Sequence, residues 1–354
     1  MALLDDLLGP ELAADVRAAG APPTIQPASA RPEALSQWEA AGLARLTGRP
    51  GGPAPPPPPA LVDALWELPQ VLAWATASFG EPVVVDGLEL LAERARATGF
   101  RRGGSRSVGG VSRLLACADG WIAVSLARPD DIDALPAWLG IEPPPSGERR
   151  WIAVADAVRS RPAAEVVGQA RLLALPVAAV GEMAGTAPAV RLSPLGDLDR
   201  PSAPGPAGRR PLVVDLSSLW AGPLCGRLLR SAGARVVKVE GANRPDGARF
   251  GPPSFFALMN DGKEELVVDL RTATGVGELR ELLCAADVVI EASRPRALEQ
   301  LGLDARSLAG ESAARAWVAI TGYGQNPPER EWVAFGDDAA AAGGLVVWDD
   351  EGPC

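Results

Sequence analysis

The sequence predicts an α/β protein whose C-terminal half forms a parallel, doubly wound sheet. Three features of the 354-residue chain lead to this prediction. Short apolar runs rich in β-branched residues recur after residue 210, helix-length segments separate them, and the connections are short. Such alternation of strands and helices is typical of a parallel sheet covered on both faces.

The elements of this half are read from its apolar patterns. The runs predicted as strands are almost entirely apolar, as expected of buried strands, and the segments between them carry apolar residues at helical spacing. Strands are expected at residues 211–217, 234–240, 264–270, 287–293 and 316–324, and helices at 221–233 and 274–286.

The half before residue 200 is a mixture of helices and strands. Residues 88–97 are predicted as an amphipathic helix, and residues 112–126 as a hairpin with Asp119-Gly120 at its turn. A further helix and strand are expected within residues 152–184. Proline-rich stretches cannot continue a helix or a central strand, and they predict linkers at residues 22–33, 50–59 and 201–210.

Composition excludes several classes of function. The net charge of −10 disfavours binding to nucleic acid or to an anionic membrane surface. No apolar run is long enough to span a membrane, and the acidic N-terminus does not resemble a signal peptide. The four cysteines are far apart, which suits a reducing cytoplasm and predicts no metal site.

The chain contains no histidine, and this absence excludes further chemistry. Ser-His-Asp and Cys-His catalysis and histidine-ligated metals are all ruled out. The basic residues are almost all arginine, and the only two lysines are Lys238 and Lys263.

The first strand of the C-terminal half is followed by a turn that could receive an anionic cofactor. Parallel strands place such ligands in the crevice at their carboxyl ends, beside a helix N-terminus. Glu240 closes the second strand, where a dinucleotide-binding fold has its ribose-binding acid. The Gly-x-Gly-x-x-Gly fingerprint is missing, so binding of a nicotinamide cofactor is the weaker alternative.

Longer motifs in this half resemble a known family. The segments are VVDLSSLWAGPLCGRLLRSAGARVVKVEG, then FFALMNDGKEELVVDLRTATGVGELRELLCAADVVIEASRPRALEQLGL, then VAITGYGQ. They look like the N-terminal half of class III (family III) CoA-transferases, a family that includes α-methylacyl-CoA racemase, and the resemblance covers about residues 211–345. It implies a Rossmann-like large domain that binds coenzyme A, a smaller α+β domain, and a homodimer with acyl-CoA and a carboxylic acid as substrates.

The family's coenzyme A contacts carry over onto specific positions. Arg271 is the expected phosphate partner, because a guanidinium forks onto phosphate oxygens, although a solvated surface arginine is the alternative. The remaining contacts implied by the resemblance are Leu219, Trp220, Ala221, Val268, Ala292 and Ser293.

The chain departs from the family at several positions. Gly241 and Gln300 stand where the family has basic residues, and Gly336-Asp337-Asp338 stands where the racemase branch has Gly-His-Asp. Racemisation by a histidine–aspartate pair is therefore not available. Asp337 and Asp338, with the acidic residues 349–351, could suggest a metal site, but a solvated acidic loop is the expectation.

The transferase branch needs no histidine, because its nucleophile is an aspartate that is already ionised at neutral pH. Residues 38–65 resemble the family segment that carries this aspartate, and Asp63 is the candidate at the matching spacing. An N-cap role for Asp63 is the alternative, and Pro69 is expected to interrupt the following helix.

The family's segments thus stand in rotated order in this chain. The expected domains are a lead segment at 1–37, the distal part of the large domain at 38–105, and the small α+β domain at 106–200. A linker at 201–210 precedes the coenzyme A-binding part at 211–354. Circular permutation and a two-copy fusion cut at both ends are both consistent with this order.

Three functions remain open on the sequence. The first is transfer of coenzyme A from an acyl-CoA to a carboxylate through an aspartyl mixed anhydride and an enzyme–CoA thioester. The second is a non-catalytic acyl-CoA-binding or scaffold protein, and the third is a protein that binds a nicotinamide cofactor.

Overall fold

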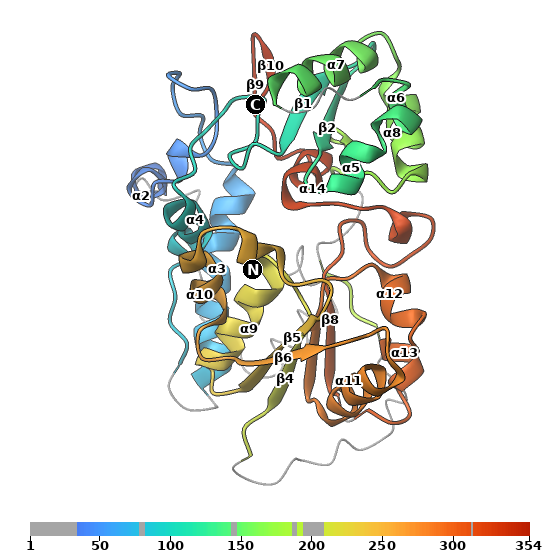
Figure 1. Ribbon diagram of the computed structural model, residues 1–354. Coiled ribbons are helices and arrows are strands. Elements are labelled where there is room, and N and C mark those ends of the chain that lie inside the picture. Colours follow the sequence, from blue (N-terminus) through green and yellow to red (C-terminus); the bar gives the residue numbers. More distant parts are fainter. Residues whose placement is uncertain (1–33, 78–81, 143–146, 186–189, 194–208, 313) are drawn as a thin grey trace.

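The computed structural model describes residues 34–77, 82–142, 147–185, 190–193, 209–312 and 314–354. In Figure 1 a five-stranded sheet with its helices forms the lower part of the molecule, and a three-stranded sheet with its helices forms the upper part. No helix among these residues is long and apolar enough to cross a membrane. The expected linker at 22–33 and most of the one at 201–210 lie outside the described residues.

The large sheet is parallel throughout, as the sequence predicted. Its spatial order is β6-β5-β4-β7-β8, so the first strand lies in the middle and the order reverses beside it. The strands are β4 (Leu212–Asp215), β5 (Arg235–Gly241), β6 (Glu264–Val268), β7 (Val288–Glu291) and β8 (Ala316–Ala319).

Helices cover both faces of this sheet because successive strand side chains point to opposite sides. Val214, Val237 and Val239 pack against α11 (Ala273–Ala285) in one core cluster. Val213 and Val236 face the other side, with partly buried residues of α9 (Ala221–Ser231) packed against them. The remaining elements of this part are η4 (Gly247–Phe250), α10 (Pro253–Asn260), α12 (Pro295–Glu299) and α13 (Ala305–Leu308).

The small sheet is antiparallel, with the order β1-β2-β3. Its predicted hairpin is confirmed, since β1 (Ser112–Ala116) pairs with β2 (Trp121–Ser125) around the Asp119-Gly120 turn. The strand β3 (Val177–Ala179) then pairs with β2. The helices of this part are α5 (Pro129–Asp133), α6 (Leu135–Leu139), α7 (Glu148–Val158) and α8 (Ala163–Leu172).

The N-terminal helices form a third core beside the large sheet. Trp38, Leu43, Val62 and Leu88 are buried together there. The expectation that Pro69 interrupts the helix after Asp63 was wrong, because α3 continues through Pro69. The elements are α2 (Ala34–Ala40), η2 (Leu43–Arg45), α3 (Pro59–Thr76) and α4 (Gly87–Thr98).

The last segment of the chain packs against the small sheet rather than the large one. The backbone N–H groups of Gly181 and Met183 donate to the carbonyls of Ala341 and Ala342, each at 2.8 Å. These carbonyls belong to α14 (Gly336–Ala342), which lies beside β2 and β3. It follows η5 (Glu329–Glu331) and precedes the hairpin of β9 (Trp348–Asp349) and β10 (Gly352–Pro353). The domain boundaries at 38–105, 106–200 and 211–354 stay a prediction.

Candidate functional site

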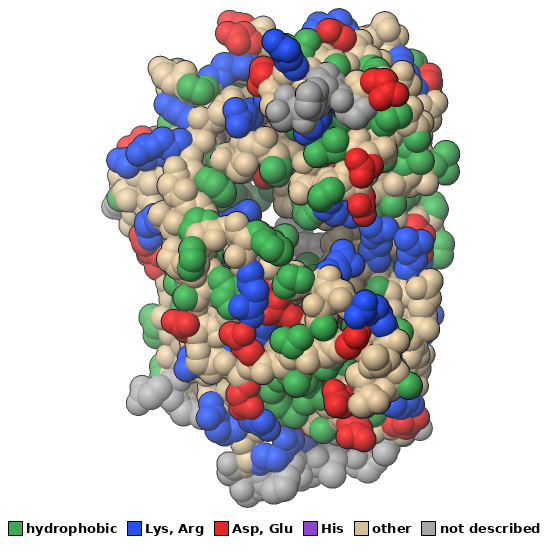
Figure 2. Space-filling model, in the orientation of Figure 1, with side chains coloured by type: hydrophobic (Ala, Val, Ile, Leu, Met, Phe, Trp, Pro, Cys, Tyr) green, Lys and Arg blue, Asp and Glu red, His purple; other side chains and the backbone are tan. Residues whose placement is uncertain are grey.

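The order of the large sheet reverses between β4 and β7, and the loops after these two strands lie at their carboxyl ends. A crevice at such a reversal is where open α/β sheets bind their ligands. The space-filling view shows a hollow between the upper and lower parts of the molecule, with blue Lys and Arg side chains gathered beside it (Figure 2). The loop after β4 provides the first part of the candidate site.

The turn from β4 into α9 has an unusual backbone. Leu219 adopts a left-handed conformation with φ of 69°, which is uncommon for a residue other than glycine. Its N–H donates to Asp246 Oδ1 at 2.9 Å, and this bond holds the turn in place. Trp220 occupies the N-cap position of α9 without a capping side chain, and Ala221 begins the helix exposed to solvent. The N–H groups of Ala221 and Gly222 therefore have no capping side chain, and the next residue, Pro223, has no N–H.

Gly222 lets this turn close tightly. A Cβ at this position would lie 2.0 Å from Ser217 Oγ and 2.2 Å from Ser217 Cβ. Any larger residue would force the turn away from the strand end, so the path of the backbone depends on this glycine.

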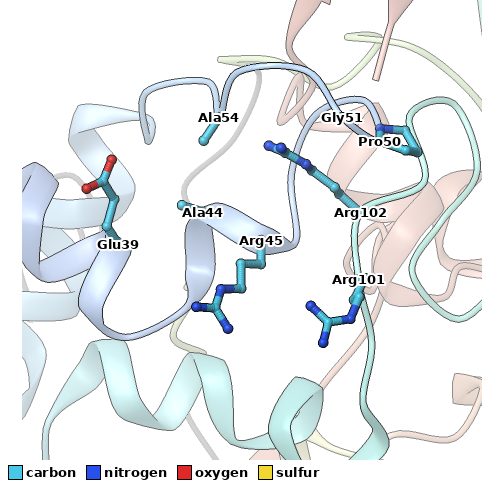
Figure 3. Close-up of a pocket in the computed structure, with 8 residues that line it drawn as sticks. All are labelled: Glu39, Ala44, Arg45, Pro50, Gly51, Ala54, Arg101 and Arg102. Carbon is cyan, nitrogen blue, oxygen red and sulfur yellow. The ribbon is translucent and has the colours of Figure 1, made fainter.

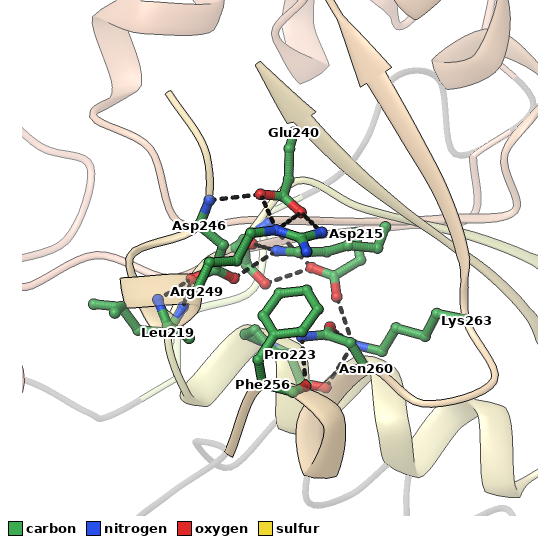
Figure 4. Close-up of polar contacts among 12 residues, drawn as sticks. Asp215, Leu219, Pro223, Glu240, Asp246, Arg249, Phe256, Asn260 and Lys263 are labelled. Atoms are coloured by element: carbon green, nitrogen blue, oxygen red, sulfur yellow. Dashed lines mark hydrogen bonds and ion pairs between the residues drawn. The ribbon is translucent and has the colours of Figure 1, made fainter. Parts of the chain in front are cut away.

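Lys263 stabilises the turn through hydrogen bonds from its side-chain amino group. Its Nζ donates to Asp215 Oδ2 at 2.9 Å, to the Pro223 carbonyl at 2.9 Å and to Asn260 Oδ1 at 3.0 Å (Figure 4). Burial lowers the pKa of Lys263, while the charge and hydrogen bond of Asp215 act in the opposite direction. The contacts join the end of β4, the first turn of α9 and the end of α10.

Lys238 provides a second buried support. Its Nζ lies 3.0 Å from Asp246 Oδ2, with both side chains fully buried, and it also donates to the carbonyl of Ser217. Asp246 in turn accepts the N–H of Leu219. The only two lysines of the chain therefore both brace the turn after β4, and neither side chain reaches solvent.

The carboxylate of Glu240 is hydrogen-bonded to neighbouring residues. Its carboxylate accepts from the Arg249 guanidinium and, at 2.6 Å, from the N–H of Asp246. Burial acts to raise the pKa of Glu240, but these hydrogen bonds outweigh it and the pKa is lowered. An acid occupied in this way is not free for a ribose, which weighs against the nicotinamide alternative.

The other residues predicted to contact coenzyme A lie on strands at different distances from the turn after β4. Ala292 is exposed and Ser293 is half-buried in the loop after β7, which neighbours β4, and Ser293 Oγ donates to Glu291 Oε2 at 3.0 Å. Val268 ends β6 at the edge of the sheet, and its side chain is buried in the core. Arg271 is exposed and forms an ion pair with Asp269 at 2.9 Å. The structure thus brings Ala292 and Ser293 to the strand next to the turn, and it leaves Val268 and Arg271 two strands away.

Arg294 is a candidate that the sequence reasoning missed. It is half-buried directly after Ser293, and no ion pair or side-chain hydrogen bond holds its guanidinium among the described residues. Burial lowers its pKa first, and the charges of Arg128, Arg296 and Arg244 lower it further. A basic Ser-Arg-Pro-Arg run after a buried strand was the available signal. Arg128 is paired with Asp131, whereas Arg294, Arg296 and Arg244 have no carboxylate partner among the described residues, and three such positive groups form a favourable place for an anion.

A second arginine connects the turn with two distant segments. The Arg94 guanidinium of α4 lies 5.7 Å from the ring centre of Trp220 and 5.7 Å from that of Phe255. Burial lowers the pKa of Arg94, and the charge of Asp337 opposes the shift. Part of the N-terminal helices and the turn after β4 therefore meet around this side chain.

Asp63 lies within α3, where it is half-buried. The N-cap of α3 is Pro58, so the alternative that Asp63 caps this helix was wrong. Its helix packs against α4, which carries Arg94.

Of the acidic residues expected in a solvated loop, Asp337 and residues 349–351 are exposed, and the expectation was wrong only for Asp338. Asp338 is completely buried and accepts from Ser125 Oγ at 2.7 Å, while Asp337 accepts from Ser112 Oγ at 2.9 Å. The two serine hydroxyls lie 2.8 Å apart. Burial raises the pKa of Asp338 to about 6. Asp349 pairs with Arg49 at 2.6 Å, and the described residues contain no group of three or more acidic or cysteine side chains able to hold a metal ion.

Comparison with known proteins agrees with the motifs of the C-terminal half. Residues 210–352 match the sequence model of CoA-transferase family III, which confirms the predicted resemblance for this segment. A succinyl-CoA–D-citramalate CoA-transferase of Chloroflexus aurantiacus is 33% identical over 140 residues, which are 38% of this chain and 35% of that protein. A succinate–glutarate CoA-transferase of Agrobacterium fabrum is 34% identical over 136 residues, or 35% of this chain and 34% of that protein.

Among solved structures, a hypothetical protein of Mycobacterium tuberculosis is similar, with 33% identity and a TM-score of 0.38. That likeness covers 41% of this chain and 42% of the other. A CaiB/BaiF family protein of Brucella suis has 29% identity and the same TM-score, over 46% of this chain and 43% of the other. The chain spans about a third of the length of the curated relatives it matches.

Proposed function

We propose that the protein transfers coenzyme A from an acyl-CoA to a carboxylic acid. The observation that carries this proposal is the turn after β4. It presents the uncapped start of α9 at the sheet reversal, next to the unpaired Arg294, inside the segment that matches CoA-transferase family III. A helix N-terminus and guanidinium groups are the natural partners of a nucleotide phosphate.

In this proposal the loops after β4 and β7 receive the coenzyme. Leu219, Trp220 and Ala221 line it on one side, and Ala292, Ser293 and Arg294 on the other. Val268 contributes only backbone, because its side chain is in the core. Arg271 would have to leave its exposed ion pair with Asp269 to reach a phosphate.

The proposed nucleophile is the carboxylate of Asp63. It attacks the thioester carbonyl, the carbon–sulfur bond breaks, and a mixed anhydride and the coenzyme A thiolate form. The thiolate then attacks the carbonyl of Asp63, so the donor leaves as a carboxylate and an enzyme–CoA thioester remains. The acceptor carboxylate attacks this thioester, the carbon–sulfur bond breaks, and a second mixed anhydride and the coenzyme A thiolate form. The thiolate finally attacks the acceptor carbonyl, which releases the new acyl-CoA and restores Asp63.

No step of this cycle needs a histidine. Carboxylates are ionised at neutral pH and the thiolate is carried between steps, so no general base has to remove a proton. Residues 38–200 and 211–354 would act as one unit with rotated segment order. Arg49, which pairs with Asp349, joins these two stretches.

The experiment is mass spectrometry of the purified protein after incubation with succinyl-CoA, the donor named for one relative, with and without glutarate. A covalent coenzyme A adduct on a peptide containing Asp63 is expected, and borohydride should convert this thioester to an alcohol. An adduct on another aspartate would remove Asp63 from its role while keeping the transferase.

The second candidate is an acyl-CoA-binding protein without transferase activity. Gly241 and Gln300, which stand where the family has basic residues, favour it. Binding of coenzyme A in calorimetry without an adduct and without product would support this candidate. Absence of any coenzyme A binding would contradict both. A homodimer, which the resemblance implies, is tested by light scattering after size-exclusion chromatography.

A further inference from the structure

A second basic cavity lies away from the turn after β4. It has a volume of about 570 Å³, and its walls come from residues 39–54 and from residues 101–102. None of the residues of the proposed coenzyme A site lines it. Its volume is within the range of small-molecule sites, roughly 300–1,000 Å³. Three guanidinium groups line it, those of Arg45, Arg101 and Arg102 (Figure 3).

These three arginines lack the carboxylate partners that many other arginines of the chain have. Among the described residues, no ion pair and no side-chain hydrogen bond is formed by Arg45 or Arg101, and both are exposed. Among the same residues the Arg102 guanidinium donates only to the carbonyl of Gly52, and its Nη1 is buried without an acceptor. The chain has 44 acidic residues, so a lack of carboxylates does not explain these unpaired groups.

The walls of the cavity are held by backbone contacts. The N–H of Arg102 donates to the carbonyl of Arg45 at 2.8 Å, and the N–H of Gly104 donates to that of Gly48 at 3.1 Å. The neighbouring Arg49 is fixed by its ion pair with Asp349. In Figure 3 the Arg101 side chain is directed toward Arg45, and that of Arg102 extends into the space between the two segments. A site with fixed walls loses little conformational freedom when a ligand binds.

The single carboxylate of the lining, Glu39, has no ion pair with the three arginines. Figure 3 shows it on the side of the cavity opposite Arg101 and Arg102. The cavity therefore has a cationic wall that suits a multiply charged oxyanion and an acceptor that suits a hydroxyl or amino group. Guanidinium groups match phosphate oxygens in pairs, and an Nη1 group without an acceptor gains a partner when an oxyanion arrives.

We propose that this cavity binds a phosphate ester or diphosphate through Arg45, Arg101 and Arg102, at a site separate from the sheet crevice. The shared chemistry is a phosphate group with at least two negative charges. A nucleotide and a free polyphosphate are its two sources. The test of this site does not depend on transferase activity, because binding of either source is measured without any acyl-CoA.

The experiment is calorimetric titration of the full chain with pyrophosphate and with ADP, at about 50 mM salt so that screening stays weak. The test variant is Arg45→Gln with Arg101→Gln, since both side chains are exposed and their loss leaves the core intact. Its affinity is expected to fall at least about tenfold, because two charge-assisted hydrogen-bonding groups are lost. The matched control is Arg149→Gln with Arg159→Gln, which removes two exposed arginines at α7 with the same change of net charge.

A third variant, Arg294→Gln, separates this cavity from the sheet crevice. It should leave pyrophosphate affinity within about twofold of the parent, while the Arg45/Arg101 variant loses it. Where the affinity is lost in the Arg45/Arg101 variant, tighter binding of ADP than of pyrophosphate identifies a nucleotide, and equal or weaker binding of ADP identifies a free polyphosphate; both support the site. The proposal is overturned if neither probe binds, if the control loses as much affinity as the test variant, or if only Arg294→Gln has an effect.

Discussion

Lys263 Nζ lies 2.9 Å from Asp215 Oδ2, with both side chains completely excluded from solvent. The pair joins the last residue of β4 to the segment between α10 and β6, directly beneath the turn that begins α9. Lys238 and Asp246 form a second buried pair on the other side of the same turn. Two ion pairs in the interior are expensive to desolvate, so their position under one turn indicates that the shape of this turn matters.

Removing one partner of the Lys263–Asp215 pair is expected to destabilise the protein strongly. Lys263→Met leaves the Asp215 carboxylate buried without its counter-charge, which costs about 3–5 kcal/mol of the free energy of unfolding. Urea denaturation measures this loss. The double variant Lys263→Met with Asp215→Asn should recover part of it. Arg235→Gln, which breaks an exposed pair with Glu264, is the control and should cost less than about 1 kcal/mol.

Gly222→Ala tests the close approach in the same turn. Its Cβ would overlap Ser217, so we expect a loss of about 1–3 kcal/mol in stability and weaker coenzyme A binding. Gly277→Ala is the matched control, because a Cβ at this position of α11 meets open space. The control should raise stability by about 0.5–1 kcal/mol through helix propensity. Equal melting temperatures for the two variants would contradict the prediction.

Arg294→Gln tests the anion-binding role of the loop after β7. Loss of one charge-assisted hydrogen bond of about 1.5–3 kcal/mol should raise the dissociation constant of coenzyme A about 10- to 150-fold. Arg306→Gln, an exposed position in α13, removes the same charge without facing the crevice and should change it little. Calorimetry with coenzyme A and with dephospho-coenzyme A checks both. An unchanged affinity for Arg294→Gln would exclude this residue as a phosphate ligand.

Asp63→Asn tests the proposed nucleophile. The amide cannot form the mixed anhydride, so transfer from succinyl-CoA to glutarate should fall at least about a thousandfold. Coenzyme A affinity should be retained, because the change is isosteric and lies outside the proposed phosphate contacts. Asp133→Asn, an exposed residue at the end of α5, is the control and should keep full activity. Persistent turnover in the Asp63 variant would assign the chemistry to another carboxylate.

The buried carboxyl of Asp338 predicts a pH dependence of stability. Its pKa is raised to about 6 in the folded protein, whereas an unfolded aspartate has a pKa of about 3.9. Between these values the folded state holds more protons, so the contribution of Asp338 to stability falls as pH rises from about 4 to about 6. The loss is on the order of 3 kcal/mol for a shift of two units. The stability difference between the parent and Asp338→Asn should therefore change over this range, and a constant difference would contradict the assignment.

Much of the large sheet could be predicted from the sequence. Strands that are buried on both faces must be apolar almost throughout, so runs such as residues 211–217 and 234–240 are recognisable without any partner. The Asp119-Gly120 turn could be predicted as well, because its two residues favour the backbone of a tight hairpin. Pro69 was misleading: proline is unfavourable in a helix interior, yet α3 continues through it because tertiary packing outweighs local propensity.

The sequence by itself determined which segments form the strands of the large sheet, that no histidine takes part, and which family the motifs of residues 210–352 resemble. Only the tertiary structure decided which charged side chains of the site lie next to one another. Lys263 and Asp215 are 48 residues apart, and Asp338 and Ser125 are 213 apart. Local patterns report the period of a helix or strand, but the pairing of a buried charge depends on which distant segments meet. The two lysines, Arg294 and the three arginines of the second cavity became interpretable only when their neighbours were known.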